Sequence, residues 1–289
     1  MNDRDWEILR ILYDKRNITQ AAKTLYISQP ALTFRLQQIE NEFGIKIAHR
    51  GRKGLEFTVQ GEQLVLYAKE MLLQLRKTKD ILCNMESSVR GIIRLGVAGT
   101  IACYVLPAIL KQFNIQYPGI EFNINTGWSA DMVNLLLRQE VHIGIIRGDY
   151  NWPDQKQLLM EESLLVVSNR EIKLDDLPYL PRIDYKTDPT LKESIDNWWL
   201  ETYSQAPLST MHVDKLETCK EFVRNGLGYA IFPGLTVKNE DHLFSIKLLS
   251  RDNVPVMRRT WLVYRKDSLE LSIVKMFIDF LKNYSYQKV

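Results

Sequence analysis

Residues 28–35 include side chains that can hydrogen-bond to DNA bases. Gln and Arg can each form two hydrogen bonds with one base edge in a major groove. The candidates for contact with DNA in this segment are Ser28, Gln29, Pro30, Thr33 and Arg35. Three cations that suit backbone phosphates follow, namely Arg50, Arg52 and Lys53. These residues favour a DNA-contacting surface, although a small helical domain with a solvated polar face would have a similar pattern.

A second set of polar residues follows predicted strands in the C-terminal part of the chain. In open α/β sheets, ligands bind beyond the carboxyl ends of strands and at helix N-termini. The residues at such places are Thr100, Trp128, Ser129, Arg147, Lys186 and Thr187. If Arg147 and Lys186 both face one cleft, the ligand should be anionic, and a guanidinium favours a carboxylate. We therefore predict a small organic acid or amino acid as the ligand.

Structural roles are open for several of these residues. Ser129 and Thr100 can each cap the helix that they open, and Trp128 can pack in the interior. Arg147 precedes Gly148-Asp149, so it can pair with Asp149 instead of with a ligand.

Motifs for catalysis, nucleotide binding and metal binding are missing from the sequence. It contains no GxSxG elbow, no P-loop and no HExxH. The four histidines lack ligand spacing, and Cys83, Cys103 and Cys219 form no CxxC pair. A redox pair of Cys103 and Cys219 is an alternative, but neither lies in an electropositive cluster. We expect no enzyme activity, no metal and no cofactor other than a small-molecule effector.

Three short helices and a hairpin are expected to position the DNA-contacting residues. Trp6 begins the first apolar helical pattern, Asn17 is a predicted cap for a helix over 18–25, and Ser28 caps a third helix that ends at Gly44. The second and third helices form a helix-turn-helix. Two β-prone runs, 45–48 and 55–58, flank the cations and predict a β-hairpin wing.

One long helix is predicted for residues 59–88. Apolar or small residues recur at alternating spacings of three and four, namely Leu64, Ala68, Met71, Leu75, Thr78, Leu82 and Met85. This seam favours a two-helix coiled coil over a single helix that lies on its own domain. A dimer places two recognition helices about one DNA turn apart, so we expect a roughly palindromic binding site.

Strands and helices alternate from residue 89 onward and predict two α/β lobes. The first lobe has predicted strands at 92–97, 121–125 and 142–146 and helices at 101–115 and 130–139. The second has predicted strands at 164–168, 180–184, 209–213, 228–232 and 260–264 and helices at 190–203 and 215–225. A last helix, 269–283, is expected to return to the first lobe. We place the domain boundaries at 1–58, 59–88 and 89–289, with lobe I at about 89–162 and 266–289 and lobe II at about 163–265.

The small net charge of +3 conceals an uneven distribution of charge. Residues 1–90 carry 15 basic and 11 acidic side chains, whereas the rest of the chain carries 23 and 24. This excludes a uniformly basic protein that coats DNA but allows a small basic surface. No apolar run approaches the length of a membrane span, and the first ten residues lack the features of a signal peptide, so we expect a cytoplasmic protein without a membrane partner.

The combined motifs resemble those of LysR-type transcriptional regulators. The N-terminal residues that carry the resemblance are Ala21-Ala22, Leu25, Ser28-Gln29-Pro30-Ala31-Leu32-Thr33, Leu36, Ile39-Glu40, Phe43-Gly44, Arg50, Thr58 and Gly61. The C-terminal ones are Ile93-Arg94-Leu95-Gly96, Leu106-Pro107, Phe113, Tyr117-Pro118, 141–145, Val223, Gly226-Leu227-Gly228, Ile231 and Pro233. The resemblance covers nearly the whole chain. It implies a winged helix-turn-helix, a linker helix that pairs subunits, and a two-lobed domain similar to type 2 periplasmic solute-binding proteins.

The resemblance also implies a function. Members of the family regulate transcription in response to a small molecule between the lobes, and the effector contacts of the family match Thr100, Ser129 and Arg147. Assembly into dimers and tetramers is implied by the family as well. The sequence departs from the family pattern at Phe34, where a polar or basic residue is usual, and at Ile47-Ala48, where Leu-Phe is usual. For Phe34, contact with a thymine methyl group and simple packing both stay open.

Two other classes of protein would share the two lobes. A secreted solute-binding protein would need a signal peptide and no winged helix, and the first 90 residues argue against it. A small-molecule enzyme would need convergent acid and base residues in the cleft, and we find none in the sequence.

Overall fold

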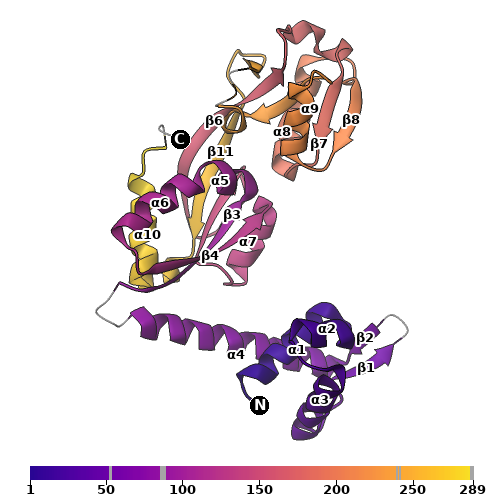
Figure 1. Ribbon diagram of the computed structural model, residues 1–289, viewed down its shortest axis with the longest axis vertical. Helices are drawn as coiled ribbons and strands as arrows, with labels where there is room; N and C mark the ends of the chain where they lie inside the picture. Colours follow the sequence, from indigo (N-terminus) through magenta and orange to yellow (C-terminus); the bar gives the residue numbers. More distant parts are fainter. Residues whose placement is uncertain (52–53, 85–88, 239, 241, 287–289) are drawn as a thin grey trace. The chain divides into compact units, whose positions relative to one another are not determined.

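A computed structural model describes residues 1–51, 54–84, 89–238, 240 and 242–286. The chain forms two compact units, Met1–Met85 and Glu86–Val289, shown in Figure 1. Among the described residues, no helix has the length and apolar character needed to cross a membrane. Arg52 and Lys53 of the predicted wing, and Met85 of the predicted seam, lie outside the described residues.

The described residues of the N-terminal unit form four helices and one hairpin. Its elements are α1 (Asp3–Lys15), α2 (Ile18–Thr24), α3 (Gln29–Phe43), β1 (Ala48–Gly51), β2 (Gly54–Phe57) and α4 (Val59–Asn84). The predicted caps of α2 and α3 are confirmed, because the side chains of Asn17 and Ser28 accept hydrogen bonds from Gln20 N and Ala31 N. Gly44 ends α3 with φ of 63°, a left-handed conformation that glycine adopts at little cost.

The hairpin begins later than the sequence predicts. The predicted strand 45–48 is wrong except at its last residue, since β1 starts at Ala48. Side chains satisfy part of the preceding backbone, and Thr58 N donates to Ile47 O at 3.0 Å. The Glu40 carboxylate accepts a hydrogen bond from Ile47 N at 2.9 Å, and Thr58 Oγ1 donates to Lys46 O at 2.6 Å.

Helix α4 packs its first turns against its own unit. Leu64, Val65 and Ala68 are buried in the N-terminal core, which they share with apolar residues of α1. The prediction that Leu64 and Ala68 face a second helix in a coiled coil is therefore wrong, because α1 already covers them. Later seam residues have more exposed side chains, and Leu82 is 58% exposed.

Lobe I of the C-terminal unit is a twisted sheet with helices on it. Its strands, in spatial order, are β4 (Ile120–Gly127), β3 (Gly91–Ala98), β5 (Ile143–Arg147), β11 (Met257–Tyr264) and β6 (Gln155–Ser168). Its helices are α5 (Gly99–Tyr104), α6 (Leu106–Gln116), α7 (Ser129–Leu137) and α10 (Ser272–Asn283), the last preceded by a 3-10 helix, η3 (Lys266–Glu270). The first three strands are parallel, as the alternating pattern predicts. Strand β11 pairs antiparallel with β5, and β6 pairs antiparallel with β11.

Lobe II is built on the second half of β6. Its other strands are β7 (Arg182–Tyr185), β8 (Ser209–Val213), β9 (Ala230–Pro233) and β10 (Phe244–Lys247). Its helices are α8 (Pro189–Thr202), α9 (Leu216–Arg224), η1 (Leu174–Tyr179) and η2 (Gly234–Thr236). The apolar residues of α8 and α9 belong to two different core clusters, each of which includes strand residues of this lobe.

Strands β6 and β11 connect the lobes, and Figure 1 shows them between the lobe with α8 and α9 and the lobe with α6 and α10. Residues 260–264 pair with β5 in the sheet of lobe I, so their predicted assignment to lobe II is wrong. The predicted helix 101–115 is two helices, α5 and α6, because Pro107 in the first turn of α6 lacks the N–H that a continuous helix needs.

Candidate functional site

Arg35 on α3 points toward α1. Its Nε and Nη2 lie 2.5 and 2.6 Å from the carboxylate oxygens of Asp5, and its Nη1 donates to Gln38 at 2.6 Å. Asp5 is buried; burial raises the pKa of its carboxyl, but the hydrogen bonds from Arg35 and Asn2 outweigh this effect and leave the pKa lowered. The structure does not support base reading by Arg35, since its guanidinium is bound within the protein and joins α3 to α1.

The other DNA-contact candidates on α3 differ in their exposure. Thr33 Oγ1 donates to the carbonyl of Gln29 at 2.9 Å, and both side chains are half-buried. Pro30 is exposed, and Phe34 is 62% exposed, so Phe34 does not pack into the core. Arg50 on β1 is also exposed. Among the described candidates, Ser28, Pro30 and Arg50 are therefore exposed, and Phe34 is exposed beside them.

The six ligand candidates in the C-terminal unit lie together. A pocket of about 430 Å³ between the lobes is lined by Thr100, Trp128, Ser129, Arg147, Lys186 and Thr187. Sequence reasoning missed further lining residues, among them Tyr185, Asp188, Lys215 and Arg258. A larger hollow of about 810 Å³ within lobe II shares only Lys186 and Thr187 with the six candidates. The inter-lobe pocket is therefore the candidate ligand site.

Ser129 and Asp188 tie the two lobes together at this pocket. The expected cap role of Ser129 is wrong, because Trp128 is the N-cap residue and makes no capping bond with its side chain. Ser129 N instead donates to Asp188 Oδ2 across the pocket at 3.0 Å, while Ser129 Oγ accepts from Arg147 N at 3.0 Å. Asp188 Oδ1 also accepts from Tyr150 at 3.0 Å, and burial and this carboxylate raise the pKa of Tyr150 to about 12.

Arg147 is buried at the carboxyl end of β5. It forms an ion pair with Glu162 and not with Asp149, which lies beside Arg259. Burial, together with the neighbouring Arg258, holds the pKa of Arg147 well below its ordinary value. Burial also lowers the pKa of Arg258.

Several polar atoms beside the pocket have no hydrogen-bond partner among the described residues. Two of them belong to the ion pair between Arg147 and Glu162. The atoms are the three guanidinium nitrogens of Arg147, Nε of Arg258, Oγ1 of Thr260 and Oε1 of Glu162. These four residues are neighbours in the sheet, because Arg147 lies opposite Thr260 and Arg258 lies opposite Glu162. Four neighbouring residues beside the pocket therefore carry buried polar atoms that still lack a hydrogen bond to any described residue.

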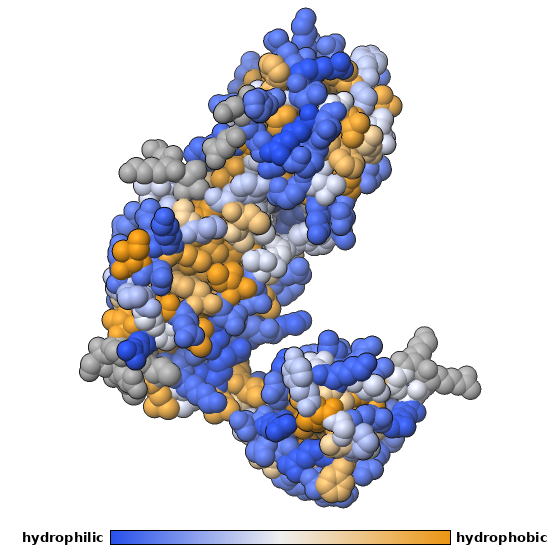
Figure 2. All heavy atoms as spheres, in the orientation of Figure 1, coloured by the Kyte–Doolittle hydropathy of each residue, from blue (hydrophilic) through white to orange (hydrophobic). Residues whose placement is uncertain are grey.

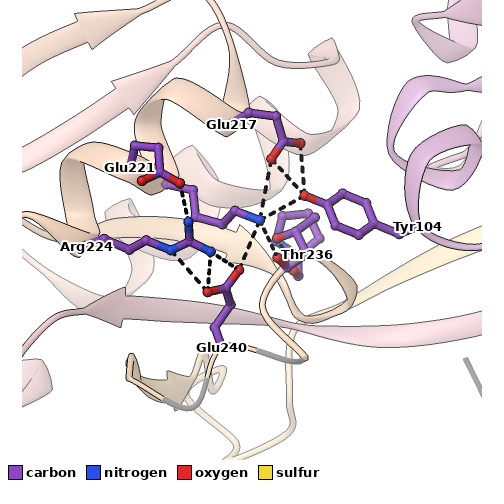
Figure 3. Close-up of polar contacts among 8 residues, drawn as sticks. Tyr104, Glu217, Glu221, Arg224, Thr236 and Glu240 are labelled. Atoms are coloured by element: carbon purple, nitrogen blue, oxygen red, sulfur yellow. Dashed lines mark hydrogen bonds and ion pairs between the residues drawn. The ribbon is translucent and has the colours of Figure 1, made fainter.

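A polar cluster joins α5 of lobe I to α9 of lobe II, as Figure 3 shows. The Tyr104 hydroxyl donates to Glu217 at 2.8 Å, and Lys220 Nζ donates to that hydroxyl at 3.0 Å. Lys220 is buried and also donates to Thr236 O and pairs with Glu240 at 3.2 Å. We name Tyr104, Glu217, Lys220 and Glu240 the inter-lobe latch. The two helices it joins begin at the pocket, where Thr100 and Leu216 line the wall.

The pair Cys103 and Cys219 does not support redox sensing. Cys103 is exposed, but Cys219 is buried, and burial raises the pKa of its thiol to about 12. A thiol with such a pKa remains protonated and unreactive near neutral pH. Within the described part of the chain, no group of three or more metal-ligating side chains occurs.

Sequence comparisons identify the family of the protein. Residues 4–62 match the model of the bacterial regulatory helix-turn-helix protein, lysR family, and residues 86–285 match that of the LysR substrate binding domain. The chain belongs to the LysR family. This LysR-family protein is a DNA-binding transcriptional regulator with an effector-binding domain, and not an enzyme.

Relatives and solved structures agree with this family. The chain is 43% identical over 282 residues to the uncharacterized HTH-type transcriptional regulator YraN of Bacillus subtilis, and the match covers 98% of both chains. It is 35% identical over 285 residues to YkuM of the same organism, over 98% of this chain and 97% of YkuM. Full-length CbnR in complex with its target DNA is similar in fold, with a TM-score of 0.69 and 18% identity over 98% of this chain and 99% of CbnR. A full-length OxyR variant from Pseudomonas aeruginosa has a TM-score of 0.64 and 18% identity over 99% of each chain.

Proposed function

We propose that this LysR-family regulator binds a small carboxylate between its lobes and that this ligand controls its binding to DNA. The observation that carries the proposal is the set of buried donors on Arg147 and Arg258 that, beyond the ion pair with Glu162, have no hydrogen-bond partner among the described residues. A buried donor without a partner costs about 1–3 kcal/mol, and more when it is charged. A ligand carboxylate can accept hydrogen bonds from a guanidinium in pairs and would remove this cost.

The charges around the pocket favour an anion. Its lining includes four cations, Arg147, Lys186, Lys215 and Arg258, and one carboxylate, Asp188. Lys186 Nζ lies 5.0 Å from the ring of Trp128, which is 40% exposed and can pack against an apolar part of the ligand. A carboxylate that carries an apolar or amino group therefore fits this lining.

Two protein carboxylates suggest how the ligand acts on the lobes. Glu162 pairs with Arg147, and Asp188 holds Ser129 N of the opposite lobe. A ligand carboxylate would compete with both for the same donors and so favour a different arrangement of the lobes. By linkage, a ligand that binds one arrangement better shifts the population toward it, typically with a coupling free energy of about 1–3 kcal/mol.

A thermal-shift screen of the full chain tests this proposal. The probes are succinate, glutamate, citrate and benzoate, each beside an uncharged control such as its amide. We expect at least one carboxylate to raise the Tm in a concentration-dependent way, because a ligand of the native state stabilises it. Equal shifts by the amides, or no shift with any carboxylate, would contradict the proposal.

The inter-lobe latch gives a second expected result. Tyr104→Phe removes the hydroxyl that joins Glu217 to Lys220. We expect carboxylate affinity to rise about fivefold, since one hydrogen bond of about 1 kcal/mol no longer favours the present arrangement of the lobes over the one that the ligand favours. Isothermal calorimetry with the carboxylate found in the screen measures this change. Tyr179→Phe is the matched control, since Tyr179 is 72% exposed. Unchanged affinity in Tyr104→Phe would show that the latch does not act on the pocket.

We also infer that the regulator acts as a dimer, and as a tetramer when two dimers associate, on a roughly palindromic DNA site. Exposed apolar residues on α4 support this inference, since Leu66 and Leu82 are 59% and 58% exposed. A monomeric mass by light scattering at micromolar concentration, with or without DNA, would contradict it.

A further inference from the structure

The exposed surface of the first turns of α3 is largely apolar. Phe34 is 62% exposed, and Pro30 and Ala31, one helical turn before it, are exposed too. Residues three and four apart lie on the same face of a helix, so these three side chains form one surface. Figure 2 shows apolar residues reaching the surface of the N-terminal unit among mostly hydrophilic ones. A large aromatic ring left in water is unfavourable, which points to a partner for this surface.

Two polar side chains of the same turns are already engaged within the protein. Arg35 is bound to Asp5 and Gln38, and the Thr33 hydroxyl donates to the carbonyl of Gln29. The polar groups on either side of Phe34, the Thr33 hydroxyl and the Arg35 guanidinium, therefore already have partners within the protein. In a helix-turn-helix protein, the N-terminal residues of the second helix contact base edges in the major groove. The apolar surface of α3 lies at that end of the helix.

Only one common group in the major groove is apolar. The edges of all four bases present hydrogen-bond donors and acceptors, and thymine alone adds a methyl group at C5. We propose that Phe34 selects the binding site of this regulator by contact with thymine methyl groups, with Pro30 and Ala31 completing the apolar surface. This proposal concerns the DNA-binding unit and does not depend on the ligand of the inter-lobe pocket.

Deoxyuridine substitution tests the contact, because it removes the methyl group and leaves base pairing intact. The probe is the tightest-binding duplex selected from a random-sequence pool by the full-length wild-type protein. Each thymine is replaced in turn by deoxyuridine, and Kd is measured by fluorescence anisotropy. We expect one or two positions per half-site at which Kd rises about fourfold, the factor that corresponds to burial of one methyl group. A wild-type Kd that no deoxyuridine changes would overturn the proposal.

Variants then assign the methyl contact to Phe34. Phe34→Ala should bind the selected duplex about tenfold more weakly and should lose its sensitivity to deoxyuridine at the same positions, whereas Phe34→Leu should keep part of it. Phe43→Ala is the matched control, since Phe43 lies at the other end of α3 and is 43% exposed. Circular dichroism verifies that each variant is folded. If Phe34→Ala keeps the full deoxyuridine effect, another residue reads the methyl group and the assignment is wrong.

Discussion

Arg147→Met is expected to abolish the carboxylate-dependent rise in Tm. Arg147 is 1% exposed and lines the inter-lobe pocket. In the variant, a carboxylate in this pocket would lack the charge-assisted hydrogen bonds from the guanidinium, and water could not replace them there. Two such bonds correspond to about 3 kcal/mol, or roughly a hundredfold in affinity. Calorimetric titration with the carboxylate identified by thermal shift measures the loss directly.

The design must separate ligand binding from stability. Removal of Arg147 leaves the Glu162 carboxylate without its ion-pair partner in the interior, which is itself destabilising. The double variant Arg147→Met/Glu162→Gln removes both charges and should keep the fold while it still fails to bind. Arg138→Met is the matched control, since Arg138 is exposed at the end of α7. Wild-type affinity in the double variant would exclude Arg147 from the ligand site.

Arg35→Ala should weaken the N-terminal unit without changing base preference. The variant leaves the buried Asp5 carboxylate without its counter-ion. We expect this loss to lower the free energy of unfolding by about 2 kcal/mol, which is less than for a fully buried ion pair because Arg35 is partly exposed. Hydrogen exchange of amides in α1 and α3 of the full chain measures this loss as faster exchange. Selection from a random-sequence pool should give the same site for the variant and the wild type. An altered site with unchanged exchange would mean that Arg35 reads bases after all.

The same ion pair predicts a pH dependence of stability. The folded state lowers the pKa of Asp5, so the stabilisation is complete above the unfolded pKa of about 4 and is lost as pH falls through the lower folded value. Wild-type protection of α1 amides should therefore decline below about pH 4. Arg35→Ala should show less of this decline, because only the Asn2 N–H and the N-terminal ammonium would then lower the pKa of Asp5.

The rule that ligands bind beyond the carboxyl ends of parallel strands selects six residues from the sequence, and all six line one pocket in the structure. Thr100 follows β3, Ser129 follows β4, and Arg147 is the last residue of β5. These three strands are parallel neighbours in the sheet. The rule missed Arg258 because β11 is antiparallel to β5, so that the beginning of β11 meets the end of β5. A strand direction of this kind is not visible in the residues of the strand itself.

Contacts between residues distant in the chain were the other limit. Local hydrogen bonds, such as the caps at Asn17 and Ser28, follow from residue type and spacing over three positions. The pairing of Arg35 with Asp5 spans 30 residues, and that of Tyr104 with Glu217 spans 113. The sequence pattern does not indicate pairs so distant in the chain. It therefore predicts Arg35 as a base-reading residue and does not predict the inter-lobe latch.

The central claim is that an anion in the inter-lobe pocket and DNA on the winged helix-turn-helix affect each other's binding. The most direct test is fluorescence anisotropy of a labelled duplex from the selected pool, titrated with the full chain with and without the carboxylate found by thermal shift. We predict that the ligand changes Kd for DNA by about 5- to 150-fold and that saturating DNA changes Kd for the ligand by the same factor. The Arg147→Met/Glu162→Gln variant should show no such change. A carboxylate that binds the wild-type protein but leaves its Kd for DNA unaltered would contradict the account.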